Sequence, residues 1–182
     1  MANRTTEDVF SLLDNLLKWT KSQIGNLNVV YQDVDAVEVV DSVIDVFNMV
    51  AGLKKITIRE EKPEKLPVCT DIDMLKTIIR NLLSNAIKFS NENSEVLVKM
   101  EEQGDTVVVS VKDSGCGIDE EGQQKLLHTD THFSTFGTNN EEGSGLGLLL
   151  CQDFAVKSGG KLWFTSKKGE GSTFYFSIPL KK

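Results

Sequence analysis

Apolar residues recur at helical spacing in four long segments of the chain. In residues 36–53 the valines and one phenylalanine repeat at i, i+3, i+4 and i+7, and in residues 71–90 a broad apolar side faces a polar stripe. Gly52 and Lys54-Lys55 are typical of the C-terminal end of the helix predicted over residues 36–53. The pattern predicts helices over residues 7–24, 36–53, 71–90 and 145–157, and a shorter one over 119–127.

Short runs rich in β-branched residues lie between these helices. Residues 106–112 contain Val107-Val108-Val109 and Val111, as expected for a buried strand. Because strands and helices do not alternate strictly, the predicted class is α+β, a mixed sheet with helices on one face. The predicted strands are residues 55–60, 68–70, 95–101, 106–112, 161–166 and 172–178, and the last two form a hairpin.

The first helix has two adjoining apolar stripes but no obvious core partner of its own. Leu12, Leu16 and Trp19 form one stripe, and Leu13, Leu17 and Ile24 form the other. Such a helix packs either on the main domain or in a helical bundle completed by other sequence or by a second copy, and the bundle is the favoured interpretation.

Composition narrows the possible functions. The 182 residues carry a formal charge of −7 and are 40% hydrophobic, and there is no basic block, so a nucleic-acid or anionic-membrane binder is disfavoured. No 18 consecutive apolar residues occur, and the N-terminus has no apolar signal core, so we expect no membrane contact. The three widely spaced cysteines form neither a zinc motif nor a disulfide framework, which favours reduced thiols in the cytoplasm.

The polar stripe of the 71–90 helix contains candidate ligand groups. Asn81, Asn85 and Lys88 fall within about 60° of one another on a helical wheel, and Phe89 lies beside them. Taken alone, such a stripe is more often a solvated helix face, and a lone Phe is more often part of a core. Amide oxygens and an ammonium group are also what an Mg–nucleotide requires, and an aromatic ring could stack on a base.

Two glycine-rich loops complete the candidate chemistry. Asp113-Ser114-Gly115-Cys116-Gly117 follows a predicted buried strand, where a carboxylate could accept hydrogen bonds from an exocyclic amino group. Gly143-Ser144-Gly145-Leu146-Gly147 immediately precedes a helix, an arrangement that can bind phosphate through free backbone N–H groups. Neither the dinucleotide fingerprint nor a Walker A motif matches.

In order along the chain, these motifs resemble the ATP-binding catalytic domain of two-component sensor histidine kinases. The stretch Asn81-Leu82-Leu83-Ser84-Asn85-Ala86-Ile87-Lys88-Phe89-Ser90 is similar to that family's N box, and the two loops resemble its G1 and G2 boxes. Gly169-x-Gly171-Ser172-Thr173 resembles the G3 box. The resemblance covers roughly residues 30–180 and implies a two-layer sandwich with a mixed, mostly antiparallel five-stranded sheet and about three helices on one face.

The resemblance also implies roles for single residues. Asp113 would bind the adenine amino group with Thr173 nearby, Asn85 would coordinate Mg²⁺, Lys88 would reach a phosphate and Phe89 would face the adenine. Residues 128–144 would form a lid over ATP. The remaining predicted contacts are Asn81, the glycines that admit the nucleotide (Gly115, Gly117, Gly143, Gly145 and Gly147), and the wall residues Ile118 and Leu146.

Asn81 bears on the reaction type. Hydrolysing relatives of this fold, such as gyrase and the chaperone ATPases, carry a Glu at this position, and an amide cannot activate water as a base. Phosphoryl transfer to a protein group is therefore favoured over hydrolysis. No Lys or Arg occurs in residues 126–156, so we expect γ-phosphate contact to be weak or to depend on a partner.

The acceptor histidine is expected upstream of this sequence. His128 and His132 lie in the predicted lid and lack the helical, acidic context of a phosphoacceptor. We expect residues 1–26 to be the end of a dimerisation and phosphotransfer helix and residues 27–182 to be the catalytic domain, with a response regulator downstream. The alternatives are a protein serine kinase of the same fold and a nucleotide-sensing module without catalysis.

Overall fold

The computed structural model describes residues 2–25, 27–126, 138 and 145–180. Its main sheet has five strands in the order β2-β4-β5-β7-β6. Only β2 and β4 pair in parallel, and the other three pairs are antiparallel. This confirms the predicted mixed, mostly antiparallel sheet. The strands are β2 (Thr57–Glu61), β4 (Glu95–Gln103), β5 (Thr106–Lys112), β6 (Leu162–Lys167) and β7 (Gly171–Pro179).

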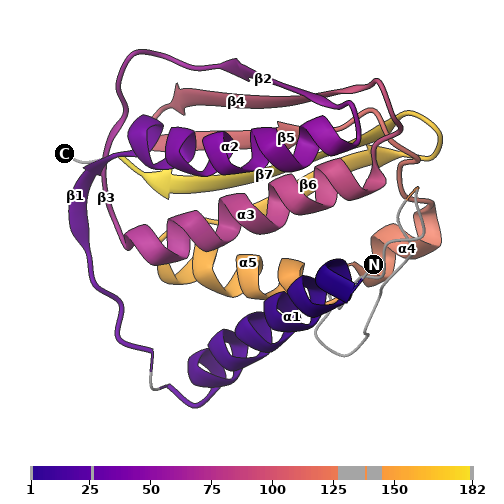
Figure 1. Cartoon of the computed structure of the whole chain (residues 1–182). Helices are drawn as coiled ribbons and strands as arrows, with labels where there is room; N and C mark the ends of the chain where they lie inside the picture. Colours follow the sequence, from indigo (N-terminus) through magenta and orange to yellow (C-terminus); the bar gives the residue numbers. More distant parts are fainter. Residues whose placement is uncertain (1, 26, 127–137, 139–144, 181–182) are drawn as a thin grey trace.

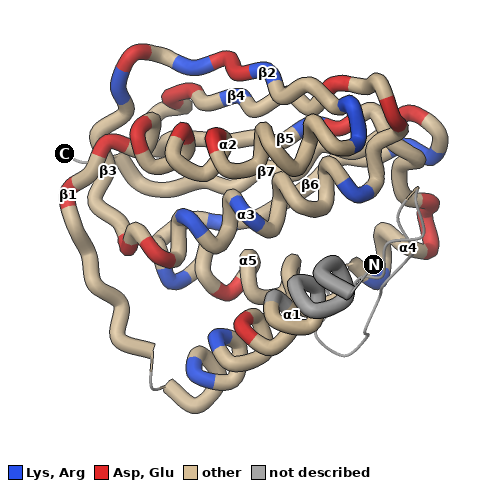
Figure 2. The backbone as a smooth tube through the Cα atoms, in the orientation of Figure 1, with Lys and Arg blue, Asp and Glu red and all other residues tan. Residues whose placement is uncertain are grey.

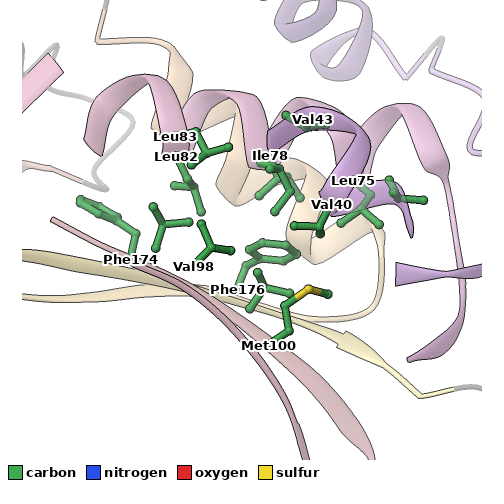
Figure 3. Close-up of a cluster of buried hydrophobic side chains, with 14 of the residues drawn as sticks. Val40, Val43, Leu75, Ile78, Leu82, Leu83, Val98, Met100, Phe174 and Phe176 are labelled. Atoms are coloured by element: carbon green, nitrogen blue, oxygen red, sulfur yellow. The ribbon is translucent and has the colours of Figure 1, made fainter. Parts of the chain in front are cut away.

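Three helices cover one face of this sheet, as Figure 1 shows: α2 (Ala36–Leu53), α3 (Ile72–Phe89) and α5 (Gly147–Lys157). Their apolar sides meet the inward-facing residues of the strands, because alternate strand residues point to the same face. Figure 3 shows the centre of this core, where side chains from α2 and α3 lie against those of β4 and β7. The labelled residues are Val40, Val43, Leu75, Ile78, Leu82, Leu83, Val98, Met100, Phe174 and Phe176.

Aspartates begin the two longest helices of this layer. The side chain of Asp71 accepts hydrogen bonds from the backbone N–H groups of Asp73 and Met74, at 2.9 and 3.0 Å. Asp35 accepts from Val37 and also from Leu66. Because the first N–H groups of a helix lack helical partners, these caps fix where α2 and α3 start.

A second, two-stranded sheet lies at the edge of the domain. In it β1 (Gln32–Asp35) pairs antiparallel with β3 (Pro67–Thr70). The sequence predicts a strand at 68–70, but not its pairing with the residues before α2. Strands of four residues carry too little periodicity to identify a partner, and the pairing depends on where α2 and the following loop place their ends.

The N-terminal helix α1 (Ala2–Gln23) lies beside α5, and the short α4 (Glu120–Lys125) follows the first glycine loop. One side of α1 contacts the domain: Trp19 packs against the core, and the buried Ser22 donates a hydrogen bond to Asp153. The other side leaves large apolar side chains exposed, among them Leu13 and Leu17. Among the described helices, none is long and apolar enough to cross a membrane.

Candidate nucleotide site

The polar stripe of α3 is present as predicted. Asn81, Asn85, Lys88 and Phe89 are all half-buried, so each side chain is partly shielded and partly accessible. The Nζ atom of Lys88 lies 5.0 Å from the ring centroid of Phe89, in a cation–π arrangement. Phe89 is thus not a core residue, and the stripe is not a fully solvated face.

Asn81 lies where α3, α5 and α1 meet. Its Nδ2 donates to the carbonyl oxygen of Thr77 at 2.9 Å, and its Oδ1 faces Gly147 at the start of α5. A Cβ atom at Gly147 would lie only 2.7 Å from that Oδ1. Asn15 of α1 donates to the same oxygen at 3.4 Å. The structure therefore brings Gly147 of the second glycine motif against Asn81 of the stripe, although the two residues are 66 positions apart in the sequence.

Asp113 follows the last residue of β5 and is only 5% exposed. Its Oδ1 accepts two backbone hydrogen bonds, from Gly115 at 2.9 Å and from Ser172 at 3.3 Å. Burial raises the pKa of the Asp113 carboxyl, because removing water disfavours the charged form, and the two N–H donors partly oppose this rise. A fixed, buried carboxyl group is suited to recognising one amino group in a defined position.

Gly115 and Gly117 are explained first by the packing of the protein on itself. A Cβ at Gly115 would lie 2.0 Å from the carbonyl oxygen of Phe89, the last residue of α3. A Cβ at Gly117, whose φ is +63°, would lie 2.0 Å from the carbonyl oxygen of Lys167. The first glycine loop is thereby fixed between α3 and β6. Contact of these glycines with a nucleotide stays a prediction.

The remaining predicted residues lie on neighbouring elements. Thr173 on β7 is opposite Lys112, next to Asp113, in the β5–β7 register. The N–H of Ile118 donates to Ser166 Oγ on β6 at 2.8 Å, which anchors the loop. Leu146 is buried and Gly145 has a φ of +69° just before α5. Gly143, His128, His132 and the rest of the predicted lid (residues 128–144), apart from Thr138, lie outside the described residues.

Lys54 follows the end of α2, as the sequence predicts. The sequence does not indicate the partners of its side chain, which donates to carbonyl oxygens at the end of α3. Ser172 is also missed, because its contribution is a backbone N–H. Ser172 belongs to the motif at residues 169–173, but neither that motif nor any periodicity identifies these two contacts, since both depend on how distant segments pack.

A metal centre built from protein groups alone is not found among the described residues, where no group of three His, Cys, Asp or Glu side chains comes together. Mg²⁺ is usually held by one or two protein oxygens together with substrate phosphates and water. The amide oxygen of Asn85, on the accessible stripe of α3, fits that smaller requirement.

Comparison with known proteins agrees with this geometry. Residues 70–182 match the family model described as histidine kinase-, DNA gyrase B- and HSP90-like ATPase. The adaptive-response sensory kinase SasA of Rippkaea orientalis is 30% identical over 171 residues, which are 93% of this chain and 43% of the relative. The sensor histidine kinase WalK of Bacillus subtilis is 28% identical over 179 residues, or 97% of this chain and 29% of that protein.

Solved structures show the same fold. The nucleotide-free catalytic domain of histidine kinase ThkA has a TM-score of 0.72 and 30% identity, covering 83% of this chain and 96% of that one. Full-length ShkA in complex with AMPPNP has a TM-score of 0.81 and covers 100% of this chain and 38% of that one. At 23% identity, the second likeness concerns the fold alone.

The chain belongs to the family of histidine kinase-, DNA gyrase B- and HSP90-like ATPases. Within that family it is an ATP-binding catalytic domain of the sensor-kinase type, as the kinases among its relatives indicate. The chain spans less than half the length of these sensor-kinase relatives.

Proposed function

We propose that this domain binds Mg–ATP between α3 and the two glycine motifs and donates the γ-phosphate to a histidine of a phosphotransfer domain. In this assignment Asp113 accepts a hydrogen bond from the adenine amino group, Phe89 faces the base and Lys88 reaches a phosphate. Thr173, Ile118 and Leu146 line the base, while Gly143, Gly145 and Gly147 lie along the phosphates. Catalysis of this kind rests on positioning and electrostatic stabilisation.

The observation that carries this proposal is the burial and hydrogen bonding of the Asp113 carboxyl group. A carboxyl group that is 5% exposed costs free energy in the folded protein, and buried carboxyl groups of this kind cluster at functional sites. Two backbone N–H groups hold its Oδ1 in place. It lies beside the end of α3, because Gly115, two residues on, packs against the carbonyl of Phe89. The loop that carries the proposed base-recognition group therefore packs against the end of the proposed phosphate-binding stripe.

Asn85 is the residue that would hold Mg²⁺ together with the ATP phosphates. A bound Mg²⁺ would neutralise phosphate charge. Helix α3 places Asn85 one turn from Asn81, and the side chain of Asn81 donates a hydrogen bond to the carbonyl oxygen of Thr77. Asn81 supports transfer over hydrolysis, because its amide has no basic group with which to activate water.

Residues 1–26 are proposed to be the end of a dimerisation and phosphotransfer helix, and residues 27–182 the catalytic domain. The exposed apolar side of α1 supports this assignment, since Phe10, Leu13 and Leu17 are 74%, 57% and 55% exposed and would be buried in a helical bundle. A response regulator would receive the phosphate in turn. The three free cysteines accord with a cytoplasmic location.

Phosphate chemistry provides the test of this function. The domain is incubated with γ-labelled Mg–ATP and a histidine-bearing phosphotransfer domain, and label on that partner is tested for stability in acid and base. We expect phosphate that is lost in acid, as for phosphohistidine. Acid-stable phosphate would support a serine kinase instead, and ATP binding without transfer to any partner would support a nucleotide-sensing module.

The absence of Lys and Arg from residues 126–156 gives a second measurement. If γ-phosphate contact is weak in this domain by itself, Mg–ADP and Mg–ATP should bind with similar affinity in calorimetry. A much higher affinity for ATP would contradict this expectation.

A further inference from the structure

Lys54 is a buried lysine that joins three segments of the chain. It follows directly after α2 and is only 7% exposed. Figure 2 shows basic positions in blue at the end of this helix. Its Nζ donates to the carbonyl oxygens of Ile87 at 3.1 Å and Lys88 at 2.8 Å. It also donates to Thr138 Oγ1 at 2.6 Å. Burying an ammonium group is costly unless its donors are satisfied, so a lysine in this place needs an explanation.

The two carbonyl oxygens belong to the last turn of α3. Carbonyl groups at a helix C-terminus lack partners within the helix and carry the negative end of its dipole, so a cation there stabilises the turn. The same turn contains Lys88 and Phe89 of the proposed nucleotide site. The next carbonyl oxygen, that of Phe89, is the one against which Gly115 packs. The ammonium of Lys54 thus fixes the helix end that joins the phosphate-binding stripe to the Asp113 loop.

Thr138, which lies between α4 and the second glycine motif in the sequence, contacts this helix end. Its N–H donates to the carbonyl oxygen of Lys88 at 3.2 Å, and its hydroxyl lies 2.8 Å from the carbonyl oxygen of Ser90. The segment of residues 126–156 has no Lys or Arg of its own. Lys54 therefore brings a cation to Thr138, which lies in a part of the sequence that is predicted to cover the nucleotide and that contains no Lys or Arg.

We infer that Lys54 is a positioning residue of the nucleotide site: its buried ammonium clamps the last turn of α3 to Thr138 and so holds Lys88 and Thr138 in fixed relation to bound Mg–ATP. This inference rests on the proposed nucleotide site. It assigns to Lys54 no contact with the nucleotide, because the hydrogen bonds described above are made to protein atoms.

The test compares Lys54→Met, which keeps the length of the side chain, with Lys54→Arg, which keeps its charge. We expect Lys54→Met to bind Mg–ATP about tenfold more weakly, the size of one charge-assisted hydrogen bond, and Lys54→Arg to recover part of the loss. Lys55→Met is the matched control, since Lys55 is adjacent and exposed, and it should leave the affinity unchanged. Calorimetry is done well below the melting temperature of each variant.

Thr138→Val separates positioning from stability. Thr138 is exposed, so this variant should melt close to the wild type and still bind Mg–ATP several-fold more weakly. The double variant Lys54→Met/Thr138→Val should bind like Lys54→Met alone, because both changes break one connection. Strictly additive losses, or wild-type affinity in Lys54→Met, would overturn the inference. If Lys54→Met does not fold, unchanged affinity in Thr138→Val overturns it equally. Failure of the wild type to bind ATP would instead refute the proposed function.

Discussion

Asp113→Asn separates the stability of this domain from its binding function. The substitution keeps Oδ1 as an acceptor for the N–H groups of Gly115 and Ser172 but replaces the other oxygen with an amide NH₂. Burial raises the pKa of the Asp113 carboxyl, so at neutral pH its charge is less favourable in the folded protein than in the unfolded chain. We therefore expect Asp113→Asn to be at least as stable as the wild type at neutral pH.

The expected cost appears in nucleotide binding. An NH₂ group facing the adenine amino group would lose a hydrogen bond to a charged acceptor and place two donors together, at about 1.5–3 kcal/mol. This corresponds to roughly 10- to 150-fold weaker binding of Mg–ATP, at 1.4 kcal/mol per tenfold. Calorimetry measures the affinity, and urea denaturation measures the free energy of unfolding. Asp105→Asn, in the exposed turn between β4 and β5, is the control and should change neither quantity.

The pH dependence of the free energy of unfolding shows which protonation state of Asp113 stabilises the folded protein. A folded-state pKa above the usual value of 3.8 means that the protonated carboxyl stabilises the fold, and that this stabilisation is lost as pH rises through the raised pKa. The advantage of Asp113→Asn should therefore shrink as pH is lowered from neutral toward the usual value. An Asp113→Asn protein that unfolds more easily than the wild type at neutral pH, or that binds Mg–ATP equally well, would refute this reasoning.

Three further predictions concern the fold. Gly115→Ala should lower the free energy of unfolding by about 1–3 kcal/mol, because the new Cβ would lie 2.0 Å from a backbone oxygen. Gly52→Ala should raise it by about 0.5–1 kcal/mol, because a Cβ there would meet nothing within 4 Å. Urea titrations measure both changes. Met100→Ala should lower the free energy of unfolding by about 2–5 kcal/mol, because Met100 is only 2% exposed. Met49→Ala should lower it by less than about 0.5 kcal/mol, because Met49 is 78% exposed. Equal losses of stability in the two variants would contradict the assigned core. A thiol reagent should modify the two exposed cysteines of the folded protein. It should modify Cys151, whose pKa is raised by burial, only after the protein unfolds. Absorbance assays of the modification with and without urea check this.

Much of the secondary structure could be predicted from the sequence because it is encoded locally. The apolar sides of α2 and α3 follow a helical period, and the valine-rich β5 lies where its composition predicts. The order of the polar stripe and the glycine motifs was sufficient to indicate the family, which the match of residues 70–182 confirms. The predicted ends of the helix over residues 36–53 and of the strand over residues 106–112 coincide with those of α2 and β5, because caps and turns are also local.

The partners of single side chains were decided by the tertiary structure alone. A lysine after a helix is consistent with a cation at that helix's own end, yet Lys54 reaches the end of α3. Gly115 and Gly147 suggest a bare backbone for a ligand, yet each is also required by a close approach of Phe89 or Asn81. The pairing of β1 with β3 likewise has no local signal.

The physical reason is the range of each interaction. Helical and strand periods arise within a few residues, so the sequence by itself determined the elements, their order and the set of chemical groups that this domain presents. Contacts between α2, α3, the glycine motifs and Thr138 join residues far apart in the chain, and they form only when the shared core fixes the distances between the elements. The tertiary structure therefore decided which carbonyl, amide and carboxyl groups meet around the proposed nucleotide site.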